Sequence, residues 1–89
     1  MIKETVPIIN KLGLHARAAA KLVSTATRFE SGIKIARNGK EVDGKSIMSV
    51  MMLAASCGTD VELIVDGTDE HEALDALKVL IADRFGEGE

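Results

Sequence analysis

A histidine and an arginine lie two residues apart in Gly13-Leu14-His15-Ala16-Arg17, where a strand gives way to an alanine-rich helix. The unpaired backbone N–H groups of a helix's first turn, here from Ala16 onward, favour a bound anion. A phosphate there would also meet the guanidinium of Arg17. Imidazole is largely neutral at pH 7, and a helix N-terminus disfavours its protonation, so His15 would offer a lone pair. These residues therefore suggest a histidine that takes up a phosphoryl group.

The ordinary interpretation of such a histidine is a solvated surface residue or a simple helix cap. Three local features favour a site instead. Gly13 permits backbone geometry that other residues resist, small alanines leave room around the ring, and Arg17 lies within reach of a bound anion. The residues alone leave both interpretations open. The second histidine, His71, has acidic neighbours and no arginine, so we interpret it as a surface residue.

Two longer segments resemble one protein family. Residues 10–17 read NKLGLHAR and resemble the active-site signature of HPr, the histidine-containing phosphocarrier of the bacterial phosphoenolpyruvate-dependent phosphotransferase system. Residues 45–55 read KSIMSVMMLAA and are similar to that family's regulatory-serine segment. The resemblance extends over essentially the whole chain. One position departs from the family pattern, because Ala18 follows the arginine where proline is common; alanine is also a good helix former.

The resemblance implies a phosphoryl relay. Enzyme I would pass the group from its own phosphohistidine to His15, which carries it on Nδ1 in this family. A histidine on the A component of a sugar permease would then receive it. Arg17 would neutralise the incoming charge, and backbone N–H groups from Ala16 onward would hold the oxygens. The alternative is a regulatory carrier of an incomplete or nitrogen-related phosphotransferase system. Such a carrier is itself the substrate of each transfer, so whether it counts as an enzyme stays open.

Ser46 has two interpretations. Its hydroxyl can cap the helix that follows, which is the ordinary role of a serine in this position. In the HPr family the matching serine is phosphorylated in some bacteria by a dedicated kinase, so a serine kinase or phosphorylase is an expected partner. A phosphate at a helix N-terminus is tolerated, and any inhibition would therefore act through repulsion or desolvation at a docking surface.

The helix after Ser46 has two apolar faces. One carries Ile47, Met48 and Met51, and the other Val50, Leu53 and Ala54. A helix that is apolar all round must be buried all round, which a small domain with one sheet cannot achieve. We expect the first face to dock partners, fringed by the basic residues Arg17, Lys21 and Lys45. The alternative is that this face belongs to the core.

The composition excludes several functional classes. The 89 residues, with a net charge of −3, predict one domain over 1–89 and argue against a nucleic-acid binder. No apolar stretch approaches the ~20 residues that a membrane span needs. A single cysteine, Cys57, cannot form an internal disulfide and favours a reducing, cytoplasmic location. We expect a monomer that needs no cofactor and no metal, since a metal chaperone would need paired soft ligands.

Hydrophobic periodicity predicts an α+β fold with the order β-α-β-β-α-β-α. The expected strands are 2–8, a pair joined by the hairpin turn Asn38-Gly39 with its return at 40–43, and 61–66. Helices are expected at 16–27, from Ser46 to Gly58, and at 70–85. This order makes an open-faced sandwich, a four-stranded antiparallel sheet with three helices on one face. A generic split β-α-β module of the ligand-sensing kind has nearly the same order and remains an alternative from topology alone.

Overall fold

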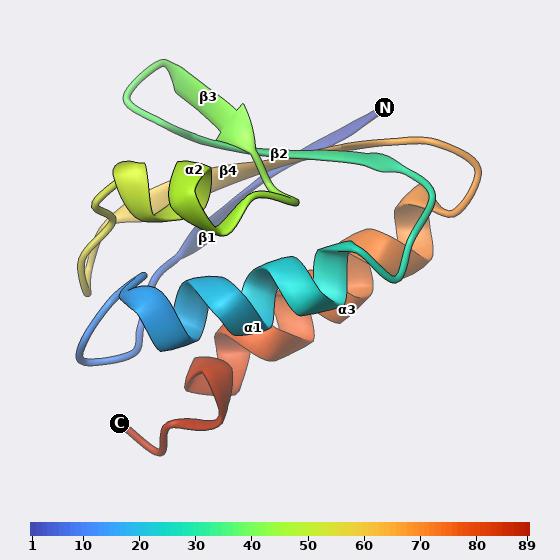
Figure 1. Ribbon diagram of the computed structural model, residues 1–89. Helices are drawn as coiled ribbons and strands as arrows, with labels where there is room; N and C mark the ends of the chain where they lie inside the picture. Colours follow the sequence, from blue (N-terminus) through green and yellow to red (C-terminus); the bar gives the residue numbers. More distant parts are fainter.

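The computed structural model describes residues 1–89 and confirms the predicted order and layers (Figure 1). The strands are β1 (Ile2–Pro7), β2 (Gly32–Arg37), β3 (Lys40–Asp43) and β4 (Asp60–Asp66). They form one antiparallel sheet in the order β1-β4-β2-β3. The helices are α1 (Ala16–Ala26), α2 (Ile47–Met52) and α3 (Glu70–Ala82), followed by a short 3-10 turn, η1 (Arg84–Gly86). All of them cover the same face of the sheet, which is an open-faced sandwich.

Local sequence explains the strand boundaries. Pro7 has no N–H to donate, and β1 accordingly lies at an edge of the sheet with Pro7 as its last residue. Asn38 and Gly39 both have positive φ, 52° and 82°, which a two-residue hairpin turn between β2 and β3 requires. The hairpin turn was predicted from the sequence.

The core is aliphatic and lies between the sheet and the helices. A cluster of 21 buried residues joins alternate residues of β2 and β4 to one stripe on each long helix. On α1 the buried stripe is Ala18, Ala19, Leu22, Val23 and Ala26. Hydrophobic periodicity favours Ala19, Ala20, Leu22, Val23 and Ala26 as this stripe, but Ala20 is only half-buried, and Ala18, outside that set, is fully buried. No helix is long and apolar enough to cross a membrane.

Two helices end earlier than the sequence predicts. The second was expected to run to Gly58, but α2 ends at Met52, and Ala54 with a φ of 51° turns the chain away. Ala54 is therefore exposed instead of buried, and Cys57 lies in the turn before β4 and not at a helix end. The third helix was expected to reach residue 85, but α3 ends at Ala82. Periodicity missed both ends because the non-glycine residues there adopt positive φ, which no local pattern signals.

The chain beyond α3 folds back toward the start of α1. Arg84 and Phe85 have φ values of 53° and 54°, so the chain reverses direction after the helix. The Phe85 side chain is fully buried in the core. Its carbonyl accepts a hydrogen bond of 2.6 Å from Nζ of Lys21 on α1. These contacts place the last residues of the chain beside the loop that carries His15.

Candidate functional site

His15 lies at the N-cap of α1, as predicted. Its backbone is extended, with φ −75° and ψ 179°, and its side chain makes no capping hydrogen bond. The ring is therefore not used to cap the helix, and the side chain is 28% exposed. The N–H groups of Ala16, Arg17 and Ala18 have no hydrogen-bond partner, since the first helical N–H to be bonded is that of Ala19, which donates to the His15 carbonyl. Three unpaired donors at a helix N-terminus form an anion site beside the ring.

A tight turn before His15 fixes its position. Gly13 has a φ of 68°, and its N–H donates 3.1 Å to the carbonyl of Asn10. A Cβ at position 13 would lie 2.6 Å from the Ala55 carbonyl oxygen and 2.8 Å from the Cα of Ser56, so only glycine fits. The next N–H, of Leu14, donates 2.9 Å to the same Ala55 carbonyl. The loop that carries His15 is thereby joined to the segment that follows α2.

Arg17 is exposed, and its guanidinium forms neither an ion pair nor a hydrogen bond within the chain. It extends from the first turn of α1, two residues after His15. An arginine that serves the fold is normally paired or packed, whereas one kept free can meet an incoming anion. The structure thus brings together His15, Arg17 and the unpaired N–H groups, which the sequence predicted as one site.

Two residues at this site were missed from the sequence, Asn10 and Glu87. One oxygen of the Glu87 carboxylate makes a short contact with Nε2 of His15, and the other accepts a 2.9 Å hydrogen bond from Nδ2 of Asn10. The same Asn10 amide donates 2.8 Å to the Gly13 carbonyl. The Asn10 side chain is fully buried, and that of Glu87 is only 9% exposed. A buried amide therefore holds a carboxylate against the histidine.

The electrostatics at Glu87 favour its ionised form. The hydrogen bond from Asn10 lowers the pKa of Glu87, and the contact with His15 and the nearby charge of Arg17 lower it further. Partial burial opposes this shift without reversing it. Nothing local could have revealed Glu87, which lies 72 residues from His15 in a stretch of glycine and glutamate. Asn10 is within the motif that carries the family resemblance, but its type alone did not show what it binds.

Ser46 is the N-cap of α2, as predicted, and its Oγ accepts a 3.3 Å hydrogen bond from the N–H of Ser49. Its side chain is half-buried. The C-terminal end of α2 is held by Arg37, whose guanidinium donates to the carbonyls of Leu53 at 2.8 Å and Ala54 at 3.3 Å. Sequence reasoning gave Arg37 no role, and only its place in β2 explains why it reaches this helix end.

The face of α2 that was predicted to be free is exposed. Met48 is 71% exposed and Ile47 42%, whereas Val50 on the opposite face is fully buried. We call the exposed apolar residues of this helix the α2 patch, which comprises Ile47, Met48, Met51 and Met52. Leu12 is also 66% exposed and lies in the His15 loop, which pairs with the segment after α2. Exposed methionines adapt to differently shaped partners.

The two lysines predicted to fringe this surface contact the backbone. Lys21 binds the Phe85 carbonyl, and Nζ of Lys45 donates 2.7 Å to the carbonyl of Phe29, beyond the C-terminal end of α1. The 11 residues of α1 span about 16 Å, so the amine of Lys45 lies at the far end of that helix from His15. His71 is exposed in the first turn of α3 and is remote from the other predicted residues.

Comparison with known proteins agrees with this geometry. The family model for the PTS HPr component phosphorylation site matches residues 2–83. A phosphocarrier protein HPr from Cupriavidus necator is 62% identical over 89 residues, with both chains covered in full. Among solved structures, an HPr from Thermoanaerobacter tengcongensis has a TM-score of 0.94 and 48% identity, with 98% of each chain covered.

An HPr dimer from the same organism matches with a TM-score of 0.79 and 48% identity, covering 98% of this chain and 100% of that one. The family model spans nearly the whole chain, and the relatives match it from end to end. The histidine loop, the helix N-terminus and the sheet order all lie inside the matched region. The chain belongs to the HPr family of phosphocarrier proteins of the phosphotransferase system.

Proposed function

We propose that His15 accepts a phosphoryl group from the phosphohistidine of enzyme I and delivers it to a histidine on the A component of a sugar permease. One observation carries this proposal. His15 stands at the N-cap of α1 beside three unpaired N–H groups, with an unpaired arginine two residues away. These groups match the three oxygens and the negative charge of a phosphoryl group.

The transfer needs no cofactor, because one phosphorus–nitrogen bond forms as another breaks. A ring nitrogen of His15 attacks phosphorus with its lone pair, the bond from phosphorus to the donor nitrogen breaks, and that electron pair returns to the donor ring. The unpaired N–H groups and Arg17 stabilise the oxygens while charge is spread over them. The second transfer reverses these roles with the A component as acceptor. In this scheme the carrier acts in the cytoplasm as a monomer.

The α2 patch is the docking surface in this proposal. It is exposed, apolar and rich in methionine, and the helix that carries it is joined to the His15 loop through Ala55. A partner bound there would have its own histidine near His15. Arg17 supplies the exposed positive charge next to the patch, which suits partners with acidic surfaces. Lys21, whose amine is bound to the Phe85 carbonyl, would add to this charge, whereas the amine of Lys45 is held at the Phe29 carbonyl, away from His15.

Ser46 is proposed as a regulatory phosphorylation site for a serine kinase. It directly precedes Ile47, the first residue of the patch, so a phosphate on Ser46 would place negative charge at the edge of the docking surface. The helix N-terminus would tolerate that charge, so the fold should survive. Inhibition would then arise from repulsion of acidic partners.

Phosphoryl transfer from enzyme I tests the proposal directly. Labelled phosphoenolpyruvate and enzyme I should place acid-labile label on the wild-type protein and on His71→Ala, but none on His15→Ala. Label that persists on His15→Ala would refute the assignment. Purified A components of sugar-type and nitrogen-related systems, offered as acceptors, would show where the group goes next. Discharge to the nitrogen-related component alone would contradict the role in sugar transport.

A further inference from the structure

The Glu87 carboxylate is held in place by contacts that come from four parts of the chain. Phe85 anchors η1 in the core, Lys21 holds the Phe85 carbonyl, and the buried Asn10 amide holds one Glu87 oxygen. The other oxygen meets Nε2 of His15. The Glu87 side chain is only 9% exposed, so it packs against the ring as part of the folded structure.

This contact determines which nitrogen of His15 carries the proton. An ionised carboxylate can only accept hydrogen bonds, so Nε2 must be the donor. In a neutral imidazole the other nitrogen, Nδ1, then holds the lone pair. No group of the chain forms a hydrogen bond with Nδ1, whereas Nε2 is covered by Glu87. Nδ1 is therefore the nitrogen that carries the lone pair and also the one without a hydrogen-bond partner.

We propose that Glu87 is a positioning residue that keeps the proton of His15 on Nε2 and so leaves the lone pair on Nδ1, the nitrogen that the family resemblance already implies. This inference rests on the proposed function, in which His15 is the acceptor. During transfer the Nδ1–P bond forms from the ring's own lone pair, and no proton leaves Nε2. The phosphorylated ring therefore carries a positive charge that the carboxylate neutralises. Onward transfer returns the pair to Nδ1 and leaves a neutral imidazole.

The orienting logic is that of carboxylate–histidine pairs in general, where the partner of one ring nitrogen sets the tautomer and the basicity of the other. Asn10 in turn orients Glu87, because its buried amide donates a hydrogen bond to the carboxylate. The last glutamate of the chain, Glu89, does not contact His15. The Glu89 carboxylate is exposed and lies 3.9 Å from the Lys11 amine, so Glu89 provides a matched control of equal charge.

The test combines a structural and a kinetic readout on Glu87→Ala, Glu87→Gln and Glu89→Ala. Nitrogen-15 shifts of the His15 ring, recorded where it is neutral, report the tautomer. Wild type and Glu89→Ala should carry the proton on Nε2, and Glu87→Ala should show a mixture of tautomers. Glutamine keeps a carbonyl acceptor and should largely preserve the proton on Nε2. Transfer from enzyme I to Glu87→Ala should be slower on the order of ten-fold, with a smaller loss in Glu87→Gln.

The outcomes separate this inference from the proposed function. If wild type takes no phosphoryl group on His15, the proposed function itself fails. If wild type is phosphorylated and Glu87→Ala keeps both the wild-type tautomer and the wild-type rate, only the role of Glu87 is overturned. A slower Glu87→Ala with an unchanged tautomer would also overturn it, because the carboxylate would then act through its charge or through the fold and not by placing the proton. Circular dichroism of each variant checks that fold.

Discussion

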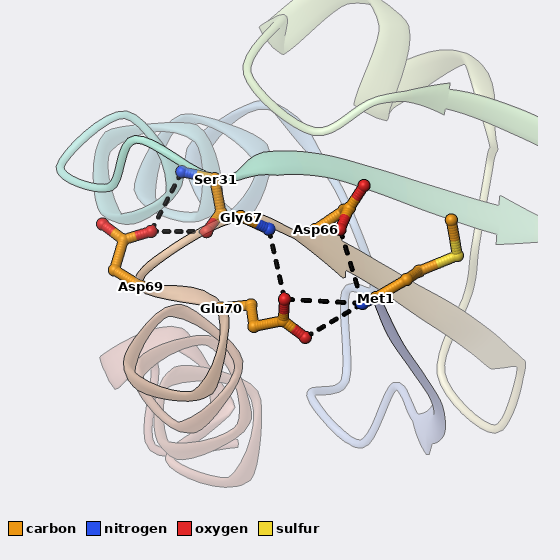
Figure 2. A network of polar contacts seen from close by, with 6 residues as sticks. All are labelled: Met1, Ser31, Asp66, Gly67, Asp69 and Glu70. Carbon is orange, nitrogen blue, oxygen red and sulfur yellow. Dashed lines mark hydrogen bonds and ion pairs between the residues drawn. The ribbon is translucent and has the colours of Figure 1, made fainter.

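Two polar clusters lie at opposite ends of α1 and differ in how completely their groups are paired. Beyond the C-terminal end of the helix, the amine of Met1, Ser31 and three carboxylates form the network drawn in Figure 2. At the N-terminal end stands the His15 site. In the network every drawn charge has a partner, whereas the site keeps Arg17 and three backbone N–H groups unpaired. Paired groups hold a fold together, and unpaired ones are available to a ligand.

The network joins the N-terminus, the loop after α1 and the start of α3. Glu70 lies 3.2 Å from the Met1 amine and accepts a 3.3 Å hydrogen bond from the Gly67 N–H. Asp69 accepts hydrogen bonds from the backbone N–H and hydroxyl of Ser31. Figure 2 shows the carboxylates of Asp69 and Glu70 directed toward these donors. This end of the molecule therefore ties three segments that are distant in sequence.

Unequal pairing predicts that the two ends respond to mutation in opposite ways, and Arg17→Ala should have the largest effect. In the proposed transfer the guanidinium stabilises phosphoryl oxygens, and it contacts nothing in the fold, so transfer should slow on the order of 10²-fold in both directions. The thermal unfolding midpoint of Arg17→Ala should match that of the wild-type protein. Arg28→Ala, exposed near the other end of α1, is the control and should transfer normally. Equal rates for the two variants would show that Arg17 is not part of the site.

The second prediction reverses that pattern at the network. Gly67→Ala would bring a Cβ to 2.6 Å from the Cα of Ser31, so two backbone segments must move apart. We expect a loss of about 1–3 kcal/mol in the free energy of unfolding, measured by urea denaturation. Transfer by the folded protein should be unchanged. Gly32→Ala is the control, because its Cβ would meet only the Asp66 carbonyl oxygen, at 3.8 Å. A stable Gly67→Ala that transfers poorly would contradict the division between the two ends.

The fold and the His15 site could be predicted from the sequence only in part. Strand alternation, the Asn38-Gly39 turn and the Ser46 cap are local signals, and the structure has each of them. The place of His15 at a helix N-terminus is also local. Glu87 was not predictable, because its contact with His15 depends on a reversal after α3 at residues with positive φ. Tertiary packing, which brings Phe85 into the core, decides that reversal and hence the carboxylate's position.

The C-terminal end of α2 also depends on tertiary contacts that the local sequence does not reveal. Its apolar pattern continues past Met52, so periodicity alone extends the helix. The chain instead turns at Ala54, where Arg37 from β2 binds the last carbonyls and Ala55 pairs with the His15 loop. These partners are remote in sequence, and the helix end is set by them. The exposure of one face of the helix, by contrast, followed from its two apolar faces and from the presence of only one sheet to cover.

A third prediction concerns how far the functional end extends over α2. Met48→Asp should weaken binding to enzyme I by more than about 1 kcal/mol, as central apolar anchors do. Stability should stay near wild type because the side chain is 71% exposed. Val79→Asp is the control, since Val79 is 68% exposed on α3 and lies outside the α2 patch. Titration calorimetry with enzyme I compares them. Equal affinities would remove α2 from the docking surface.

The smallest expected effect is the pH dependence of the paired end. The hydrogen bond from the Gly67 N–H, aided by the Met1 amine, lowers the pKa of Glu70 from 4.5, so its contribution to stability exists above that value and is lost as pH falls through the lowered pKa. Contact with Glu70, and then with Asp66, raises the pKa of the Met1 amine from 8.0. That contribution is complete below 8.0 and is lost as pH rises through the raised pKa.

Glu70→Gln should therefore be less stable than wild type mainly between about pH 4.5 and 8.0, and the difference should shrink at both extremes. The loss should be smaller than that of Gly67→Ala, because exposed ion pairs contribute little. Glu72→Gln removes the same charge from the first turn of α3 without touching the amine, and so controls for the helix dipole. Urea denaturation across pH compares the two variants. Superimposable profiles would mean that the pairing at this end contributes nothing to stability beyond helix capping, and the contrast with the His15 site would then rest on packing alone.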